Sequence, residues 1–243
     1  MKIVLLSCFL LLFFIPEISF SADSNPVWGS DMYAGSQIDT RSQSYSFIGF
    51  GLDRSLNDHL AIKGKVFFDY LTYKYSSDND IVNAKGPGGK FTLGITYFKP
   101  DFFLAVSGGV DTRKTSLSPD DKGSEARGTH TGAVLEAMLW KKLSEAFSAE
   151  VLGSYNTSGD NLWGRARFKY TIPEPVSSGR QKILIGLEGV AQGNSDYSSY
   201  QVGTILELQR IKENFSVLLN AGFKHNVSIP DSGYLGLEFY HRF

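Results

Sequence analysis

Apolar and polar residues take turns along most of this chain. Leu60, Ile62 and Val66 fall on one side of their segment, and Lys63 and Lys65 fall on the other. A period of two residues is typical of a β-strand that has one face in an apolar environment and one in a polar environment. The last residues of the chain, GLEFYHRF, continue this pattern to the C-terminus.

The alternation recurs often enough to predict an all-β fold. We expect twelve strands, an even number, near residues 28–37, 45–54, 60–70, 91–97, 102–110, 130–139, 147–155, 162–172, 183–192, 201–209, 215–224 and 235–243. An even number brings both ends to one side, as in single-chain outer-membrane barrels of bacteria. The pattern therefore predicts an antiparallel up-and-down transmembrane β-barrel.

A soluble β-sandwich is the alternative, because its strands alternate as well. Its polar faces would be open to water. Here the polar faces carry isolated charges of both signs, diluted by Gly and Ser, as expected of a closed lumen. The barrel is therefore the favoured interpretation.

The predicted connections are mostly long at one end and short at the other, as in outer-membrane barrels. The two longest predicted outer loops are SSDNDIVNAKGPGG, residues 76–89, and TRKTSLSPDDKGSEARG, residues 112–128. The inner connection IPEPVSSGRQK, residues 172–182, is longer than this rule expects.

Aromatic residues gather near the predicted strand ends, where a barrel has its two interfacial girdles. The residues expected there are Tyr70, Tyr73, Tyr75, Tyr97, Phe98, Trp140, Tyr155, Trp163, Tyr170, Tyr200 and Phe243.

The N-terminus predicts export. Lys2 precedes an apolar run from Ile3 to Ile15, which is too short for a membrane-spanning helix and ends at Pro16. We expect residues 1–21 to be a cleaved signal peptide and residues 22–243 to form an outer-membrane β-barrel. The residues before Cys8 are similar to a lipoprotein processing box, but the apolar run continues past this cysteine.

Composition narrows the class further. The 24 basic and 25 acidic side chains give a net charge of −1, which excludes nucleic acid as an expected partner. With 25 Gly, 18 Phe and 12 Tyr, the chain suits many strands joined by tight turns. The single cysteine lies within the predicted signal peptide, so we expect no disulfide and no thiolate metal site.

Charged residues on the predicted inner faces are the candidate site. They can select a passing solute, or they can pair with one another and rigidify a narrow barrel; the cost of burying unpaired charge favours the second interpretation. The predicted lumen-lining residues are Lys63, Lys65, Asp69, Glu136, Glu150, Arg165, Arg167, Lys169, Glu188, Glu207, Glu238 and Arg242.

The sequence offers little support for catalysis. It has no G-x-S-x-G elbow, and no two histidines share a strand at ligand spacing. His130 is expected to face inward at an outer strand end, which leaves an outer-membrane lipid hydrolase as a remote alternative. We predict no catalytic residues, no metal and no cofactor.

Three stretches resemble the bacterial cellulose biosynthesis protein BcsS family: SYNTSGDNLWGRARFKY, LIGLEGVAQGNSDYSSYQVG and AGFKHN followed by GYLGLEF. Leu187 stands where the family pattern has Pro, and Gln201 where Arg is common. The matching residues are Ser154, Tyr155, Thr157, Arg165, Gly186, Glu188, Gly193, Asn194, Tyr197, Val202 and Gly203.

This resemblance implies a non-enzymatic outer-membrane accessory of cellulose or exopolysaccharide secretion in a Gram-negative bacterium. The implied partners are outer-membrane lipid, the polysaccharide and other components of cellulose secretion. A small saccharide porin is the main alternative function.

Overall fold

The fold was analysed in a computed structural model, which describes residues 28–77, 80–173, 181–194, 197–227 and 229–243. These residues form twelve strands and one short 3-10 helix, η1 (Ile211–Glu213). The strands are β1 (Trp28–Asp39), β2 (Ser44–Ser55), β3 (Leu60–Ser77), β4 (Asp80–Lys99), β5 (Phe102–Ser118), β6 (Gly128–Lys142), β7 (Phe147–Asn156), β8 (Asn161–Thr171), β9 (Gln181–Gly193), β10 (Ser198–Arg210), β11 (Phe215–Asn226) and β12 (Ser232–Arg242).

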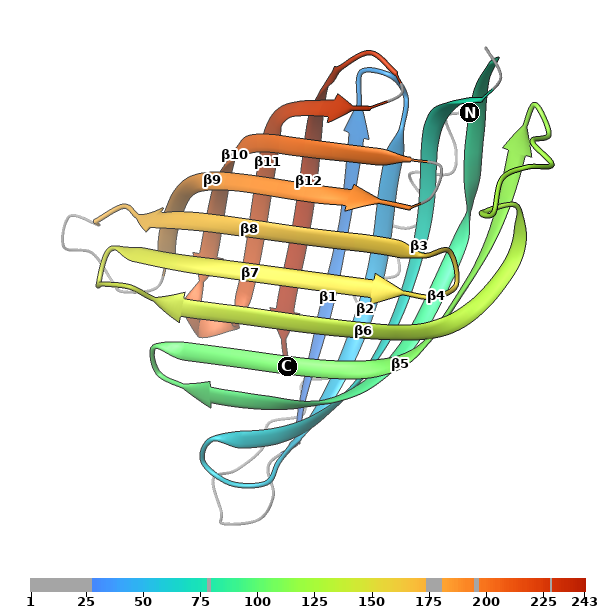
Figure 1. Cartoon of the computed structure of the whole chain (residues 1–243). Helices are drawn as coiled ribbons and strands as arrows, with labels where there is room; N and C mark the ends of the chain where they lie inside the picture. The colour runs from blue at the N-terminus through green and yellow to red at the C-terminus, as the bar shows by residue number, and fades with distance from the viewer. Residues whose placement is uncertain (1–27, 78–79, 174–180, 195–196, 228) are drawn as a thin grey trace.

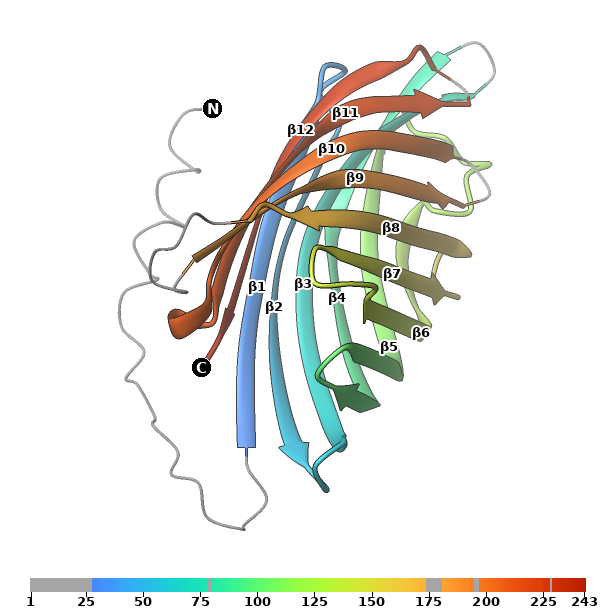
Figure 2. The same cartoon turned by 90° about the vertical axis from the view of Figure 1, so that its left-hand side faces the viewer.

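The strands close into one antiparallel barrel in which each strand pairs with its neighbours in sequence (Figures 1 and 2). The last strand β12 pairs with β1, with Asp31 opposite Arg242 and Asp39 opposite Tyr234. The predicted twelve-stranded barrel is confirmed, and this closure excludes the two open sheets of a sandwich. In Figure 1 the strands β6 to β9 cross in front of β1 and β2 at a steep angle, as strands tilted in a closed barrel do.

The alternation explains which side of each strand faces outward. Apolar side chains at alternate positions form an exposed outer surface, which suits lipid rather than water. Members of this surface include Ile62, Val66, Phe68, Leu93, Ile95, Leu135, Leu187, Val202, Leu206 and Leu235.

The predicted outer loop 76–89 is wrong, because most of its residues are strand, and the predicted loop 112–128 is too long, because residues 112–118 belong to β5. β3 and β4 have 18 and 20 residues, whereas a membrane crossing needs about 9 to 11. β5 also continues to Ser118, so that the β5–β6 connection covers only 119–127. Val82 and Ala84 face the interior of the extended barrel and are buried. They give this otherwise polar stretch an apolar face that packs inside the barrel.

The extension of β4 depends on a glycine. A Cβ atom at Gly86 would overlap the carbonyl oxygen of Lys114 on β5, so only a residue without a side chain fits there. Pro87 follows and has no N–H to donate, and the β4–β5 pairing resumes at Gly88 opposite Arg113.

The predicted aromatic girdle holds in part. Tyr70, Tyr155 and Tyr200 lie on the exposed outer surface. Tyr73 and Tyr75, in contrast, are 6% and 3% exposed and pack inside the barrel. They differ from Tyr70 by an odd number of residues, so the period of two turns them to the other side of β3.

Residues 1–21, the predicted signal peptide, lie outside the described residues. Among the residues that the structure describes, no helix is long and apolar enough to span a membrane.

Candidate functional site

Arg167 on β8 is the centre of a buried charge network. Its Nη2 atom lies 2.5 Å from Oε2 of Glu188 on β9 and 2.6 Å from Oε1 of Glu238 on β12. Glu188 also accepts hydrogen bonds from Asn220 on β11 and Tyr234 on β12. The side chains of Arg167 and Glu188 are 3% and 1% exposed, so this pair is removed from bulk water.

Two more cations of β8 extend this network. Arg165 donates to Glu150 on β7 at 3.0 Å and to Glu238 at 3.1 Å. Lys169 lies 2.8 Å from Glu207 on β10 and 3.6 Å from Glu150. Three cations thus face four carboxylates, and each charge has a partner of opposite sign, as buried charges require.

The contacts of Glu238 reach across the inside of the barrel. β8 and β12 are separated around the wall by β9, β10 and β11. Side chains from strands this far apart meet only through the lumen, so Arg165 and Arg167 with Glu238 connect two walls of the barrel.

A second group of charges lies on the wall formed by β1 to β6. Glu136 on β6 accepts from Lys65 on β3 and from Lys90 on β4, the latter at 2.5 Å. Lys63 pairs with Asp31 on β1. These ion pairs place Lys63, Lys65 and Glu136 together, but in a different part of the barrel from Arg167.

The remaining predicted residues form separate pairs. Asp69 accepts from Arg113 on β5 at 2.6 Å, and Arg242 donates to Asp53 on β2 at 3.0 Å. The twelve predicted residues therefore do not form one site. They divide between the β7–β12 network, the pairs on β1 to β6, and the pair at the end of the last strand.

Sequence reasoning missed several partners in these pairs. Arg113 lay in a stretch interpreted as a loop, and Lys90 lay between the predicted loop 76–89 and the strand predicted from residue 91. Asp31 lies in a strand whose alternation is weak. Asp39 and Lys224, which pair at 3.1 Å between β1 and β11, were missed too. The signal that could have found residues in the predicted loops is the two-residue alternation of polar and apolar positions, which continues through residues 76–89 and 112–118.

The outer end of the barrel is the end that carries the β1–β2 turn, because bacterial barrels keep both termini on the periplasmic side. Tyr73 on β3 contacts Tyr197, which precedes β10, with ring centroids 5.1 Å apart. Val82 and Ala84 complete this buried cluster. β3 and β10 lie on different walls, so the cluster reaches across the lumen at this end.

The β5–β6 connection is fastened to the same end. Tyr75 donates a hydrogen bond to Oδ2 of Asp121 at 2.9 Å. Hydrogen bonds from Ser77 and Tyr75 hold the pKa of the Asp121 carboxyl below its ordinary value. Arg127 and Asp120 form an exposed ion pair in the same connection.

His130 was the one candidate for hydrolysis. Its Nε2 atom lies 2.7 Å from the backbone carbonyl oxygen of Arg127. A hydrolase would need this nitrogen to contact a serine hydroxyl. In this structure the nitrogen contacts the backbone instead.

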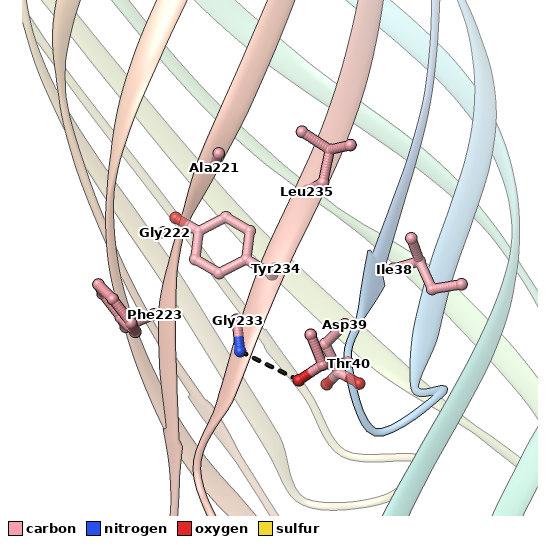
Figure 3. Close-up of a pocket in the computed structure, with 9 residues that line it drawn as sticks. All are labelled: Ile38, Asp39, Thr40, Ala221, Gly222, Phe223, Gly233, Tyr234 and Leu235. Carbon is pink, nitrogen blue, oxygen red and sulfur yellow. Dashed lines mark hydrogen bonds between the residues drawn. The ribbon is translucent and has the colours of Figure 1, made fainter.

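A shallow groove on the outer surface is lined by residues of β1, β11 and β12 (Figure 3). The exposed side chains of Ile38, Phe223 and Leu235 border it. The N–H of Gly233 donates to Oγ1 of Thr40 at 3.2 Å and ties the β1–β2 turn to β12. Buried Asp39, which pairs with Lys224 inside the barrel, also lines the groove.

Closed strand pairing, an apolar outer surface and a charged interior define an outer-membrane β-barrel. The model of the family "Cellulose biosynthesis protein BcsS" matches residues 29–243. The chain belongs to this family, and the resemblance seen in the sequence is confirmed. The sequence has no match among curated proteins.

Solved structures support the same class. The chain is similar to the β domain of the Bordetella autotransporter BrkA, with TM-score 0.53 and 13% identity over 91% of this chain and 100% of that one. It is also similar to an outer membrane channel from Pseudomonas putida, with TM-score 0.50 and 12% identity over 95% and 100% of the two chains. The translocator domain of the autotransporter NalP from Neisseria meningitidis has TM-score 0.50 and 12% identity over 89% and 87%. At these identities the likeness shows the fold alone.

Proposed function

We propose that this protein is a non-enzymatic outer-membrane barrel that assists the export of cellulose or a related exopolysaccharide made by a separate machine. Residues 1–21 direct export and are removed, and residues 22–243 form the barrel. Membership of the cellulose biosynthesis family is the observation that carries this proposal. Its partners are outer-membrane lipid, the polysaccharide and other secretion components.

The interior supports a role without catalysis. Arg165, Arg167 and Lys169 are each held by carboxylates, as are Lys65 and Lys90. Charges that hold one another stiffen the wall and are not free to act as acid, base or nucleophile. We propose that the predicted lumen-lining residues have this structural role.

A small saccharide porin is the second candidate, because the interior carries many polar groups. The contacts from β8 to β12 and the tyrosines at the outer end count against a wide, permanently open pore. A porin of this kind would also be expected to support growth on oligosaccharides.

Deletion of the gene tests the proposal. We expect the deletion strain to lose cellulose staining, to regain it when the full chain is supplied in trans, and to grow normally on oligosaccharides. Unchanged cellulose staining in the deletion strain would refute the proposed function. Slow growth on oligosaccharides with normal cellulose would favour the porin.

A further inference from the structure

Four aromatic rings cover part of the inner wall on β1, β2 and β3. They belong to Tyr33, Tyr45, Phe47 and Phe67, and we call them the aromatic platform. Ring centroids are 5.5 Å apart between Tyr45 and Phe47, 5.5 Å between Phe47 and Phe67, and 5.9 Å between Phe67 and Tyr33. The four rings therefore form one continuous surface.

Glycines opposite the platform allow its rings to lie flat. Phe47 pairs with Gly35 on β1, and a Cβ atom at this glycine would come within 2.7 Å of the Phe47 ring. Tyr33 pairs with Gly49 on β2, where a Cβ atom would overlap the Tyr33 ring. Tyr33, Tyr45 and Phe47 remain partly exposed, so ring faces are presented to the lumen.

Polar groups border the platform on two sides. Glu238 on β12 pairs with Gly35 on β1, which in turn pairs with Phe47 on β2. Lys90 lies over the Phe67 ring with its nitrogen 4.3 Å from the ring centroid. Ligand sites commonly combine aromatic side chains with a small number of polar groups that fix the orientation of the ligand.

Two buried polar atoms beside the platform have no partner. The Tyr33 hydroxyl and Oδ1 of Asp31 make no hydrogen bond among the described residues. Asp31 is 2% exposed and lies two residues before Tyr33 on the same side of β1. Both atoms lie against glycines of β2, the Tyr33 hydroxyl at Gly49 and Oδ1 of Asp31 at Gly51, so the wall itself covers them and they do not mark a ligand.

The charges beside the platform do not favour a polyanion as the ligand. Lys65 and Lys90 are held by Glu136, and Arg113 is held by Asp69. No strong net charge faces the rings, so a neutral ligand with many hydroxyl groups fits best. Sugar rings with equatorial hydroxyls present C–H faces to an aromatic ring and hydroxyls to polar groups at the edge.

We propose that the aromatic platform binds an extended, uncharged glycan, a β-1,4-glucan, by stacking its sugar rings on Tyr33, Phe47 and Tyr45. Glu238, whose side chain is 23% exposed, accepts hydrogen bonds from the sugar hydroxyls. This assignment rests on the proposed function and names the residues through which the barrel meets the polymer.

Titration calorimetry of the detergent-solubilised full protein with cellohexaose tests the proposal. Tyr33→Leu and Phe47→Leu keep an apolar side chain but remove the flat face, so each should weaken binding about tenfold. Phe50→Leu and Phe68→Leu are matched controls on the outer surface of β2 and β3 and should bind as the unchanged protein does. Maltohexaose, which is not extended, should bind more weakly than cellohexaose.

Saturation-transfer NMR on the unchanged protein gives an answer that does not depend on how the variants fold. Magnetisation should pass from aromatic protons to the ring protons of cellohexaose. Absence of transfer, equal affinity in the folded leucine variants, or equal affinity for maltohexaose would overturn the assignment.

Failure of the site and failure of the function are distinguishable. Binding of cellohexaose by a protein whose gene deletion leaves cellulose unchanged would refute the proposed function and retain the platform. Loss of cellulose on deletion, with no cellohexaose binding, would retain the proposed function and refute the platform.

Discussion

At the scale of single residues, Arg167 illustrates how this barrel handles buried charge. One guanidinium group holds carboxylates from β9 and β12, and its side chain is 3% exposed. A buried arginine with planar, two-sided hydrogen bonding suits this role better than a lysine would. Removing it would leave Glu188 and Glu238 with too few partners in a site that water does not reach freely.

We therefore expect Arg167→Met to destabilise the barrel by about 3 to 5 kcal/mol, the usual cost of breaking a buried ion pair. The free energy of unfolding in urea, measured in lipid vesicles, checks this. Arg127→Met removes the same group from an exposed pair with Asp120 and should change stability little. Equal unfolding midpoints for the two variants would contradict the expectation.

The sequence predicts which face of its strand a buried charged residue occupies better than it predicts the residues with which it pairs. The period of two places Arg165, Arg167 and Lys169 on one side of their strand. That Arg167 meets Glu238 depends on the tilt and stagger of the closed barrel, which no single strand specifies. Partners such as Asp31 were missed because the alternation around them is weak.

At the scale of elements, β3 to β5 extend beyond the other strands. β3, β4 and β5 have 18, 20 and 17 residues, whereas β7 and β8 have 10 and 11. The extensions pair with one another and pack Tyr73 and Tyr75 against Val82 and Ala84. A wall of this kind projects past the membrane on one side of the barrel.

Gly86→Ala should weaken this wall, because the added methyl group would overlap the backbone of Lys114. Overpacking of this kind costs about 1 to 3 kcal/mol. We expect faster amide hydrogen exchange at residues 83–85 and 114–118.

Gly89→Ala is the matched control, since its nearest neighbour, a carbon of the Phe68 ring, would lie 3.5 Å away. Exchange rates that change equally in both variants would show that the close approach at Gly86 does not support the β4–β5 pairing.

Composition explains why these extensions were predicted as loops. Residues 76–89 are rich in Gly, Asn and Asp, which are depleted in strands and common in turns. Hydrogen-bonded pairing of β4 with β3 and β5 overrides the preference of these residues for turns. The alternate buried positions of Val82 and Ala84 carried the strand signal, but two short apolar residues are weak evidence in a single sequence.

At the scale of the whole molecule, contacts across the lumen decide whether solutes pass. Arg165 and Arg167 join β8 to Glu238 on β12, and Tyr73 meets Tyr197 at the outer end. These contacts narrow the interior at two levels. This arrangement predicts a poorly conducting barrel.

We expect low conductance in planar bilayers for the unchanged protein. The double variant Tyr73→Ala, Tyr197→Ala should raise single-channel conductance at least about twofold, because pore width limits ion flow. Tyr200→Ala, which removes an outward-facing tyrosine, is the control and should have no effect. Unchanged conductance in the double variant would show that the tyrosine cluster is not the constriction.

The pairing of β1 with β12 has a consequence for biogenesis. Phe243 donates its N–H to Ser30 at 2.9 Å, so residues from opposite ends of the chain complete the same seam. Until β12 pairs with it during assembly, β1 has an open edge that other chains can join. Transport chaperones would therefore have to shield β1 for the entire time between its synthesis and insertion.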